Sequence, residues 1–275
     1  MAGDPAFATL SRTERVAFRV MRFLNQGGGS RAAWVWQRWV MTPLVGLLVR
    51  SRLRIHGLER LQGIPAEAPI LLVANHRTFF DLFVLGWILI TRLGRKVSFP
   101  VRSNFFYETV PGLLLGMTFT GGSMFPPFFR SSAKKAMNRL SLDILLQKLR
   151  TPGQAVGFHP EGTRNKTDDP YTLLPAQPGA GELALKARPV VLPAFILGLS
   201  NSLWAEAKAS WRKERPVIAV FGEPLELPQI PGDTRLSHHK RFADRINQRI
   251  TSLGAEERAL RSAASPPASP LPGAK

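Results

Sequence analysis

The sequence of 275 residues contains no cysteine. Disulfide frameworks, thiolate zinc sites and cysteine nucleophiles are therefore excluded. We also expect no secretory signal, because the first twenty residues contain two acids, a proline and three arginines. The apolar run over residues 39–49 has about half of the roughly 20 residues that crossing a bilayer needs. Since Pro43 also interrupts this run, we expect it to lie in a membrane rather than cross it.

Acidic residues are few. The chain has 19 Asp and Glu against 37 Lys and Arg, which gives a formal net charge of +18. Such an excess indicates a polyanionic partner, either nucleic acid or an anionic membrane surface. Because no aromatic-and-basic nucleic-acid module is recognisable, we expect the membrane and no nucleic acid.

Arginines alternate with apolar residues over residues 10–54. This pattern predicts two basic amphipathic helices, broken by the flexible glycines 27–29. Aromatic rings beside these arginines suit the bilayer interface, where a ring can stay half wet: Trp34, Trp36 and Trp39. The open alternative is a pair of ordinary packing helices with a solvated face.

After Gly57 the pattern changes to short apolar runs that alternate with helical stretches, as in an α/β domain with a mostly parallel sheet flanked by helices. The expected strands are 70–74, 154–158, 190–196 and 217–221, with a core-facing helix over 132–149. The domain prediction is therefore membrane-associated amphipathic helices over 1–56, one catalytic domain over 57–255 and a disordered tail over 256–275.

Residues 109–129 carry no charge and are about long enough to span a bilayer. They contain three prolines and several glycines, which makes a straight helix improbable. We expect buried, irregular chain near an apolar pocket, and a membrane span is the alternative.

His76 and Asp81 lie in the run ILLVANHRTFFD, which ends a buried strand and begins an apolar helix. Five residues on one helix differ by about 140° around its axis, so His76 should lie in the strand-to-helix turn, where its ring can fold back to the carboxylate. A carboxylate on one ring nitrogen leaves the other free to accept a proton. This pair predicts a general base, against the simpler reading of a capping Asp and a surface His.

The run FHPEGTRN follows another predicted strand. Its residues suit a phosphate: Arg164 offers a forked contact, Thr163 a hydroxyl, and Gly162 a close approach of the backbone. The alternative is a turn in which Glu161 pairs with Arg164.

These two blocks resemble the glycerolipid acyltransferases typified by bacterial lysophosphatidic acid acyltransferase. His76 and Asp81 match the family's histidine, four residues, aspartate motif, and residues 160–164 match its Pro-Glu-Gly-Thr-Arg block. GGSMFPPFFR offers Arg130 for a weaker arginine motif, and VVLPAFILG matches a later apolar strand with Pro193. The resemblance covers roughly residues 57–200. It implies that Glu161, Gly162, Thr163, Arg164 and Arg130 bind or order the acceptor.

The resemblance implies transfer of an acyl group from acyl carrier protein or coenzyme A to a lysophospholipid hydroxyl, with no cofactor and no metal, at the cytoplasmic face of the inner membrane as a peripheral or monotopic protein. Transfer is expected to be direct, because no Gly-x-Ser-x-Gly turn occurs. Two departures leave the acceptor open: His159 is inserted before Pro160, and Gln177 stands in a segment where many members carry lysine. A lyso-ornithine lipid acceptor and a non-enzymatic basic membrane binder are the alternatives.

Overall fold

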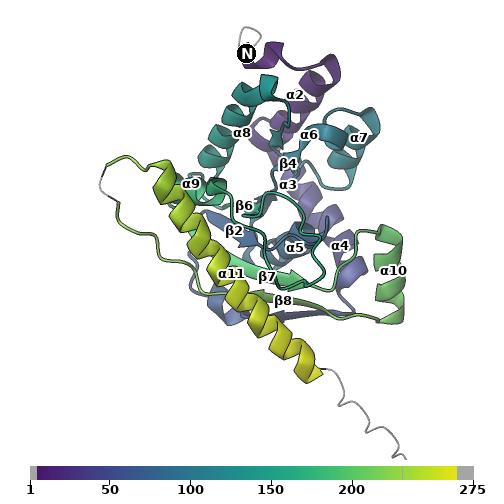
Figure 1. Ribbon diagram of the computed structural model, residues 1–275. Helices are drawn as coiled ribbons and strands as arrows, with labels where there is room; N and C mark the ends of the chain where they lie inside the picture. The colour runs from purple at the N-terminus through teal and green to yellow at the C-terminus, as the bar shows by residue number, and fades with distance from the viewer. Residues whose placement is uncertain (1–4, 231, 265–275) are drawn as a thin grey trace, which may run out of the picture.

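The computed structural model describes residues 5–230 and 232–264. Its centre is a six-stranded sheet in the order β1-β8-β7-β2-β6-β3, shown in Figure 1. The strands are β1 (Leu53–His56), β2 (Ile70–Ala74), β3 (Lys96–Ser98), β6 (Gln154–Phe158), β7 (Val190–Leu197) and β8 (Val217–Phe221). All neighbours are parallel except β7 and β8. The predicted α/β class with a mostly parallel sheet is therefore confirmed.

Helices cover both faces of this sheet. The longer ones are α2 (Arg12–Gln26), α5 (Asp81–Leu93), α8 (Lys135–Lys148), α9 (Pro178–Ala187), α10 (Leu203–Arg212) and α11 (Leu236–Ala264). Short helices and turns fill the rest of the N-terminal half: α1 (Pro5–Ala8), α3 (Ser30–Trp36), the π-helical η1 (Gln37–Met41), α4 (Thr42–Val49), η2 (Leu58–Leu61), α6 (Ser103–Phe106), α7 (Val110–Thr118) and η3 (Ser132–Lys134). A two-residue ladder joins β4 (Val101–Arg102) to β5 (Pro127–Phe128).

Alternation along the central strands divides the core into two layers. In β2, Ile70 and Leu72 join the cluster that contains α5 and the N-terminal helices, whereas Leu71 and Val73 join the cluster under α8, α9 and α11. Successive strand residues point to opposite faces, so a fully apolar strand is buried on both sides. Figure 1 shows α11 lying across one face of the sheet.

The N-terminal segment and the sheet share one core, and this changes the expected boundaries. Phe18 and Val45 are buried in the same cluster as α5. The boundary expected at residue 57 also cuts off β1, which pairs with β8 and belongs to the sheet. The sequence does not reveal β1, because its four mostly half-buried residues do not form the apolar run that marks the central strands.

The C-terminal helix extends further than predicted. Residues 256–264 were expected to begin the disordered tail, but α11 continues through them. Buried Glu257 explains this, because it accepts from the hydroxyl of Tyr171 at 2.7 Å and pairs with the guanidinium of Arg261. The rest of the expected tail, 265–275, lies outside the described residues.

The segment 109–129 has two parts. Residues 110–118 form the helix α7, whose side chains at Val110 and Leu114 are more than half exposed, so this part differs from the expected irregular chain. Residues 120–127 are buried and mostly non-helical, as expected. Within the described residues, no helix combines the length and the apolar character that a membrane crossing requires.

Candidate active site

The strands β2 and β6 are adjacent and parallel, so their carboxyl ends meet at one edge of the sheet. His76 follows β2 and His159 follows β6. The carboxyl edge of a parallel sheet is where ligands bind in open α/β folds. The topology therefore brings together two motifs that are more than eighty residues apart in the chain.

Asp81 is the first residue of α5 and is 1% exposed. Its Oδ2 accepts from the backbone N–H groups of Arg77 and Thr78, both at 2.7 Å, and its Oδ1 accepts from the hydroxyl of Thr78 at 2.6 Å. Burial raises the pKa of this carboxyl group, while a nearby His159 and these hydrogen bonds lower it. The carboxylate is thus held rigidly at the start of the helix.

His76 lies in the turn before α5, and its Nδ1 faces Oδ2 of Asp81 at 3.5 Å. The predicted pairing of the two side chains across the turn is present in the structure. Burial, and to a lesser extent the positive charges of Arg164 and Arg102, lower the pKa of His76 to about 4. At neutral pH the imidazole is therefore uncharged and able to accept a proton.

The ring of His159 stacks on the ring of His76, with centroids 3.7 Å apart and planes inclined by 6°. Its Nδ1 lies 3.0 Å from the carbonyl oxygen of Ala74, which assigns the proton to that nitrogen. Burial, and to a lesser extent the neighbouring His76, lower the pKa of His159 to about 3. The insertion noted in the sequence thus covers one face of the candidate base.

Nitrogen and oxygen atoms of His76, Asp81 and His159 lie within 4.8 Å of one another, close enough to be considered as metal ligands. However, the two imidazole rings are stacked, so their in-plane lone pairs do not converge on one point as tetrahedral coordination needs. That no metal is required stays a prediction.

Glu161 links the two loops. It is 3% exposed, and its two carboxylate oxygens accept from the backbone N–H groups of His76 at 2.8 Å and Leu174 at 2.9 Å. A second bond runs from the N–H of Asn165 to the carbonyl of His76 at 2.7 Å. With both oxygens occupied, this buried carboxylate positions the histidine loop. That Glu161 also orders the acceptor stays a prediction.

Gly162, Thr163 and Arg164 are exposed on the same loop. Gly162 has a φ of +67°, which favours glycine, and its carbonyl accepts from the guanidinium of Arg102 at 3.1 Å. Arg164 donates to the Oδ1 of Asn201 at 2.9 Å and not to Glu161, so the alternative of an internal Glu to Arg pair is absent.

Three arginines approach this edge. The charges of Arg130 and Arg164 lower the pKa of Arg102, after the larger effect of burial, and Arg102 and Arg164 both lower the pKa of His76. In residues 5–230 and 232–264, none of the three forms an ion pair with a carboxylate. Arg102 was missed from sequence, because it matches no motif and only the β4–β5 ladder brings it near Arg130.

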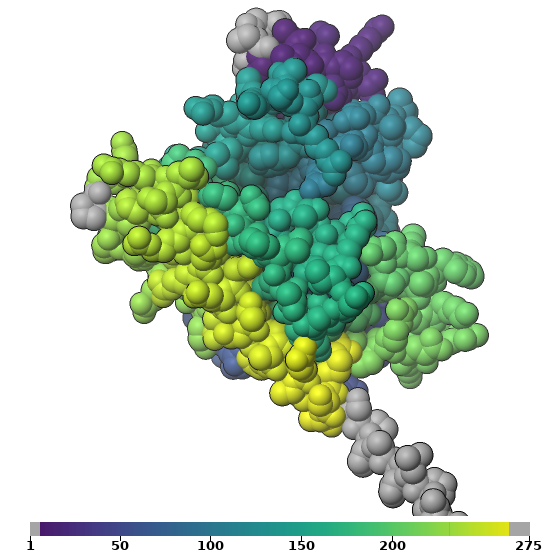
Figure 2. All heavy atoms as spheres, viewed as in Figure 1, coloured from purple at the N-terminus to yellow at the C-terminus, as the bar shows by residue number. Residues whose placement is uncertain are grey.

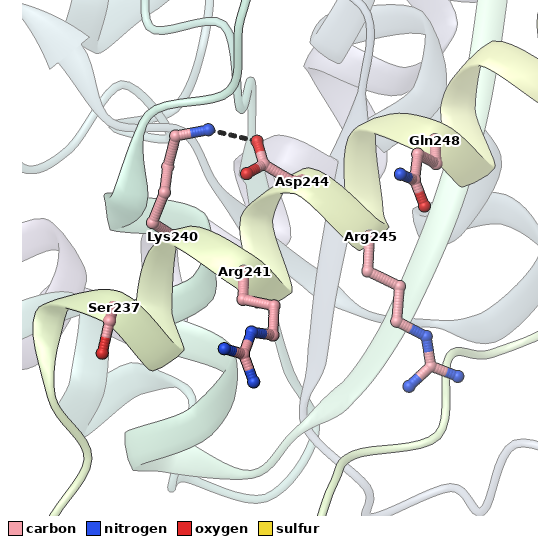
Figure 3. Close-up of a pocket in the computed structure, with 6 residues that line it drawn as sticks. All are labelled: Ser237, Lys240, Arg241, Asp244, Arg245 and Gln248. Atoms are coloured by element: carbon pink, nitrogen blue, oxygen red, sulfur yellow. Dashed lines mark hydrogen bonds and ion pairs between the residues drawn. The ribbon is translucent and has the colours of Figure 1, made fainter.

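Another hollow lies away from this edge. A groove of about 560 Å³ on α11 is lined by Lys240, Arg241, Asp244 and Arg245, among others. Figure 3 shows Lys240 bonded to Asp244, while Arg241 and Arg245 point away from the pair. The residues that line this one-helix groove include no histidine that could act as a general base, so we place the candidate site at the β2–β6 edge.

Comparison with known proteins identifies the class. Residues 52–197 match the family described as Acyltransferase, and the chain belongs to that family. The resemblance inferred from the two motifs is thereby confirmed.

Two curated relatives carry the name 1-acyl-sn-glycerol-3-phosphate acyltransferase. The protein from Saccharomyces cerevisiae is 28% identical over 173 residues, which cover 62% of this chain and 50% of the relative. The protein from Chlamydomonas reinhardtii is 29% identical over 174 residues, covering 63% and 47%. The chain therefore spans about half the length of these relatives.

The fold also has a solved counterpart. The crystal structure of the 1-acyl-sn-glycerophosphate acyltransferase PlsC from Thermotoga maritima matches with a TM-score of 0.50, 15% identity and coverage of 90% of this chain and 91% of the other. At this level of identity the match concerns the fold alone.

Proposed function

We propose that the protein transfers a fatty acyl group from an acyl thioester to the free hydroxyl of a lysophospholipid, 1-acyl-glycerol-3-phosphate, in phospholipid biosynthesis. One observation carries this proposal: an uncharged imidazole backed by a buried carboxylate lies near arginines that have no acidic partner among the described residues. The names of the two curated relatives agree with it.

In this mechanism the second nitrogen of His76, Nε2, takes the proton of the acceptor hydroxyl. The oxygen attacks the thioester carbonyl, and Asp81 stabilises the imidazolium that forms. Collapse of the tetrahedral intermediate breaks the C–S bond, and the imidazolium returns the proton to the leaving thiolate. The products are the new ester and a free thiol, so neither a covalent acyl-enzyme nor a cofactor is needed.

Arg102, Arg130 and Arg164 are proposed to bind the phosphate of the acceptor. Three clustered guanidinium groups repel one another unless an anion lies between them, and a phosphate can accept forked hydrogen bonds from each. Thr163 and the backbone at Gly162 are exposed beside them and can add contacts. Binding of the anion would also screen the charges that lower the pKa of His76, which strengthens the base when substrate is present.

The N-terminal helices are proposed to rest on the cytoplasmic face of the inner membrane, with acyl carrier protein or coenzyme A supplying the acyl group from the water side. Trp39 is 71% exposed and Leu47 78% exposed, which supports a peripheral or monotopic attachment through α3 to α4. By contrast, Phe18 and Met21 of α2 are buried against the domain. Only part of the amphipathic surface is therefore free for lipid.

The proposal can be tested by thiol release from coenzyme A and acyl carrier protein thioesters with a panel of lysolipids. We expect release that depends on lysophosphatidate. Release with lyso-ornithine lipid alone would move the acceptor to the alternative class. Vesicle binding without thiol release from either carrier would instead favour a non-enzymatic membrane binder.

The proposed base predicts a pH profile. The pKa of His76 is lowered to about 4, so the uncharged, active form exists above that pH and is lost as the pH falls through it. We expect kcat/KM to be level through neutral pH and to fall below a pH of about 4, with circular dichroism confirming that the fold persists there. A profile that instead falls around the ordinary histidine pKa of about 6.5 would contradict the lowered pKa of His76.

Arg164→Ala is expected to raise the KM for lysophosphatidate about 10- to 100-fold with a smaller change in kcat, because a charge-assisted contact to the phosphate is lost. The same variant should raise the pKa of His76, since one of the two positive charges that lower this pKa is removed. Steady-state kinetics and an NMR titration of the ring measure the two effects. Arg139→Ala, an exposed arginine on α8, is the matched control. An unchanged KM would remove Arg164 from acceptor binding.

A further inference from the structure

The most exposed large hydrophobic side chains in the described part of the chain are two tryptophans on the short helix α10. Trp211 is 89% exposed and Trp204 81% exposed, and Leu203 beside them is 50% exposed. An exposed indole ring leaves a large apolar area in contact with water. Two such rings on one helix therefore indicate a surface that another molecule covers when the protein functions.

The two rings share one face of α10. Seven residues of α-helix bring the chain back to within about 20° of its starting direction, so Trp204 and Trp211 lie along one stripe, and Lys208 lies about 40° from Trp204. Exposed cations continue to the end of the helix and beyond it at Arg212, Lys213 and Arg215. Glu214 is the single exposed acid in this stretch, and it pairs with Arg212 at 3.7 Å.

This face continues onto the end of α4. The hydroxyl of Ser210 donates to the carbonyl of Leu47 at 3.1 Å, and the hydroxyl of Ser51 donates to the carbonyl of Ser210 at 2.9 Å. Beneath them Arg52 and Glu206 form a buried ion pair. Segments about 160 residues apart are therefore fixed together, and the side chain of Leu47 is 78% exposed.

Figure 1 shows α10 beside α4 at one flank of the molecule, and in the space-filling view of Figure 2 the same segment stands out from the body. A projecting ridge can insert into a membrane surface, which is broad and deformable, more readily than it can fit a pocket on a protein partner. We name this ridge the α10 surface. It consists of Leu203, Trp204, Lys208 and Trp211 of α10, and Leu47 of α4 adjoins it.

We propose that the α10 surface is a bilayer-contact site for anionic lipid, separate in sequence from the N-terminal helices. Tryptophan is suited to the interface because its ring is apolar and its N–H is polar. The cations around it complement anionic head groups, which attract basic residues near the membrane surface. Apolar rings and cations lie on one ridge, and Glu214 is the single exposed acid within residues 203–215, so both the apolar and the charged parts of this surface complement anionic lipid.

The α10 surface is joined to the candidate site by Asn201, two residues before α10. The Oδ1 of Asn201 accepts from the guanidinium of Arg164 at 2.9 Å and from the backbone N–H of Phe79 at 3.0 Å. Docking of α10 would therefore set the position of Arg164 relative to the lipid head groups. This link rests on the proposed function, whereas lipid binding by the α10 surface does not.

The test uses the full chain and flotation with vesicles of phosphatidylcholine, with and without phosphatidylglycerol. The double variant Trp204→Ala with Trp211→Ala should bind anionic vesicles about tenfold or more weakly, because two inserted rings are lost. Lys208→Glu should weaken binding to the anionic vesicles only, by at least about fivefold. Leu236→Ala, which removes a 68% exposed side chain on α11, is the control and should bind as wild type.

Wild-type binding by the tryptophan double variant would overturn the proposal. Self-association of the wild type that the same variant abolishes, with vesicle binding unchanged, would assign the α10 surface to a second copy and also overturn it. Thiol release with a short-chain acceptor in the absence of vesicles tests the enzyme separately. Loss of vesicle binding in a chain that shows no thiol release would support the α10 surface while the proposed function failed.

Discussion

His76→Ala is expected to reduce the rate of thiol release about 10² to 10⁴-fold, which is the usual contribution of general-base catalysis. The imidazole is the proton acceptor of the proposed mechanism, and Asp81 faces its Nδ1. Because the side chain is 20% exposed and lies in a turn, its removal should leave the fold intact. The loss should appear in kcat at saturating lysophosphatidate.

His238→Ala is the matched control for this variant. His238 lies near the start of α11, where its Nδ1 accepts from the backbone N–H of Arg235 at 3.3 Å. It should release thiol at the wild-type rate. If His76→Ala kept a turnover within a few-fold of wild type while its circular dichroism was unchanged, His76 would have no part in the chemistry.

Asp81→Asn is expected to lower kcat by about 10² to 10⁴ with a small change in KM, because the imidazolium loses its negative partner. The amide keeps one oxygen, which can still accept from the backbone N–H groups of Arg77 and Thr78, so the turn should persist. Steady-state kinetics measure the loss of kcat, and thermal unfolding measures whether the stability that the turn contributes is kept.

A comparison with Asp81→Ala separates the catalytic effect of the carboxylate charge from its role in stabilising the turn. Alanine leaves both backbone donors and the hydroxyl of Thr78 without their acceptor, so this variant should lose stability as well as activity. If Asp81→Asn were nearly as active as wild type, the carboxylate would serve only to hold the turn.

Much of the sheet could be predicted from sequence, because its central strands are buried on both faces. β2, β6, β7 and β8 are short, apolar and bounded by turn residues, so each stands out as a run. β1 and β3 do not, since each is only three or four residues long and contains a basic residue. Their place depends on pairing with strands far along the chain, which no local pattern records.

The two motifs were likewise visible, while their mutual geometry was not. The sequence pattern predicts that His76 folds back to Asp81 within one turn, and the structure has this pairing. The stack of His159 on His76 and the clamp by Glu161 join residues more than eighty positions apart. Such contacts follow from the adjacency of β2 and β6, so they could be read only once the strand order was known.

The strand pairing also explains why Arg102 could not be predicted from sequence. It lies in a two-residue strand whose partner, β5, ends at Phe128, two residues before Arg130. Nothing in the surrounding sequence marks it as part of a site, yet the charge of Arg164 lowers the pKa of Arg102, and the charge of Arg102 lowers the pKa of His76. Arg102 therefore joins the proposed phosphate site on the structure alone.

The most direct measurement is mass spectrometry of the lipid formed when purified protein is given lysophosphatidate and an isotopically labelled acyl thioester. The mechanism predicts phosphatidate that carries the labelled acyl chain as an ester, with one thiol released for each molecule formed and with little product from His76→Ala. Free labelled fatty acid with no labelled phosphatidate, or equal product from both proteins, would contradict direct transfer by this site.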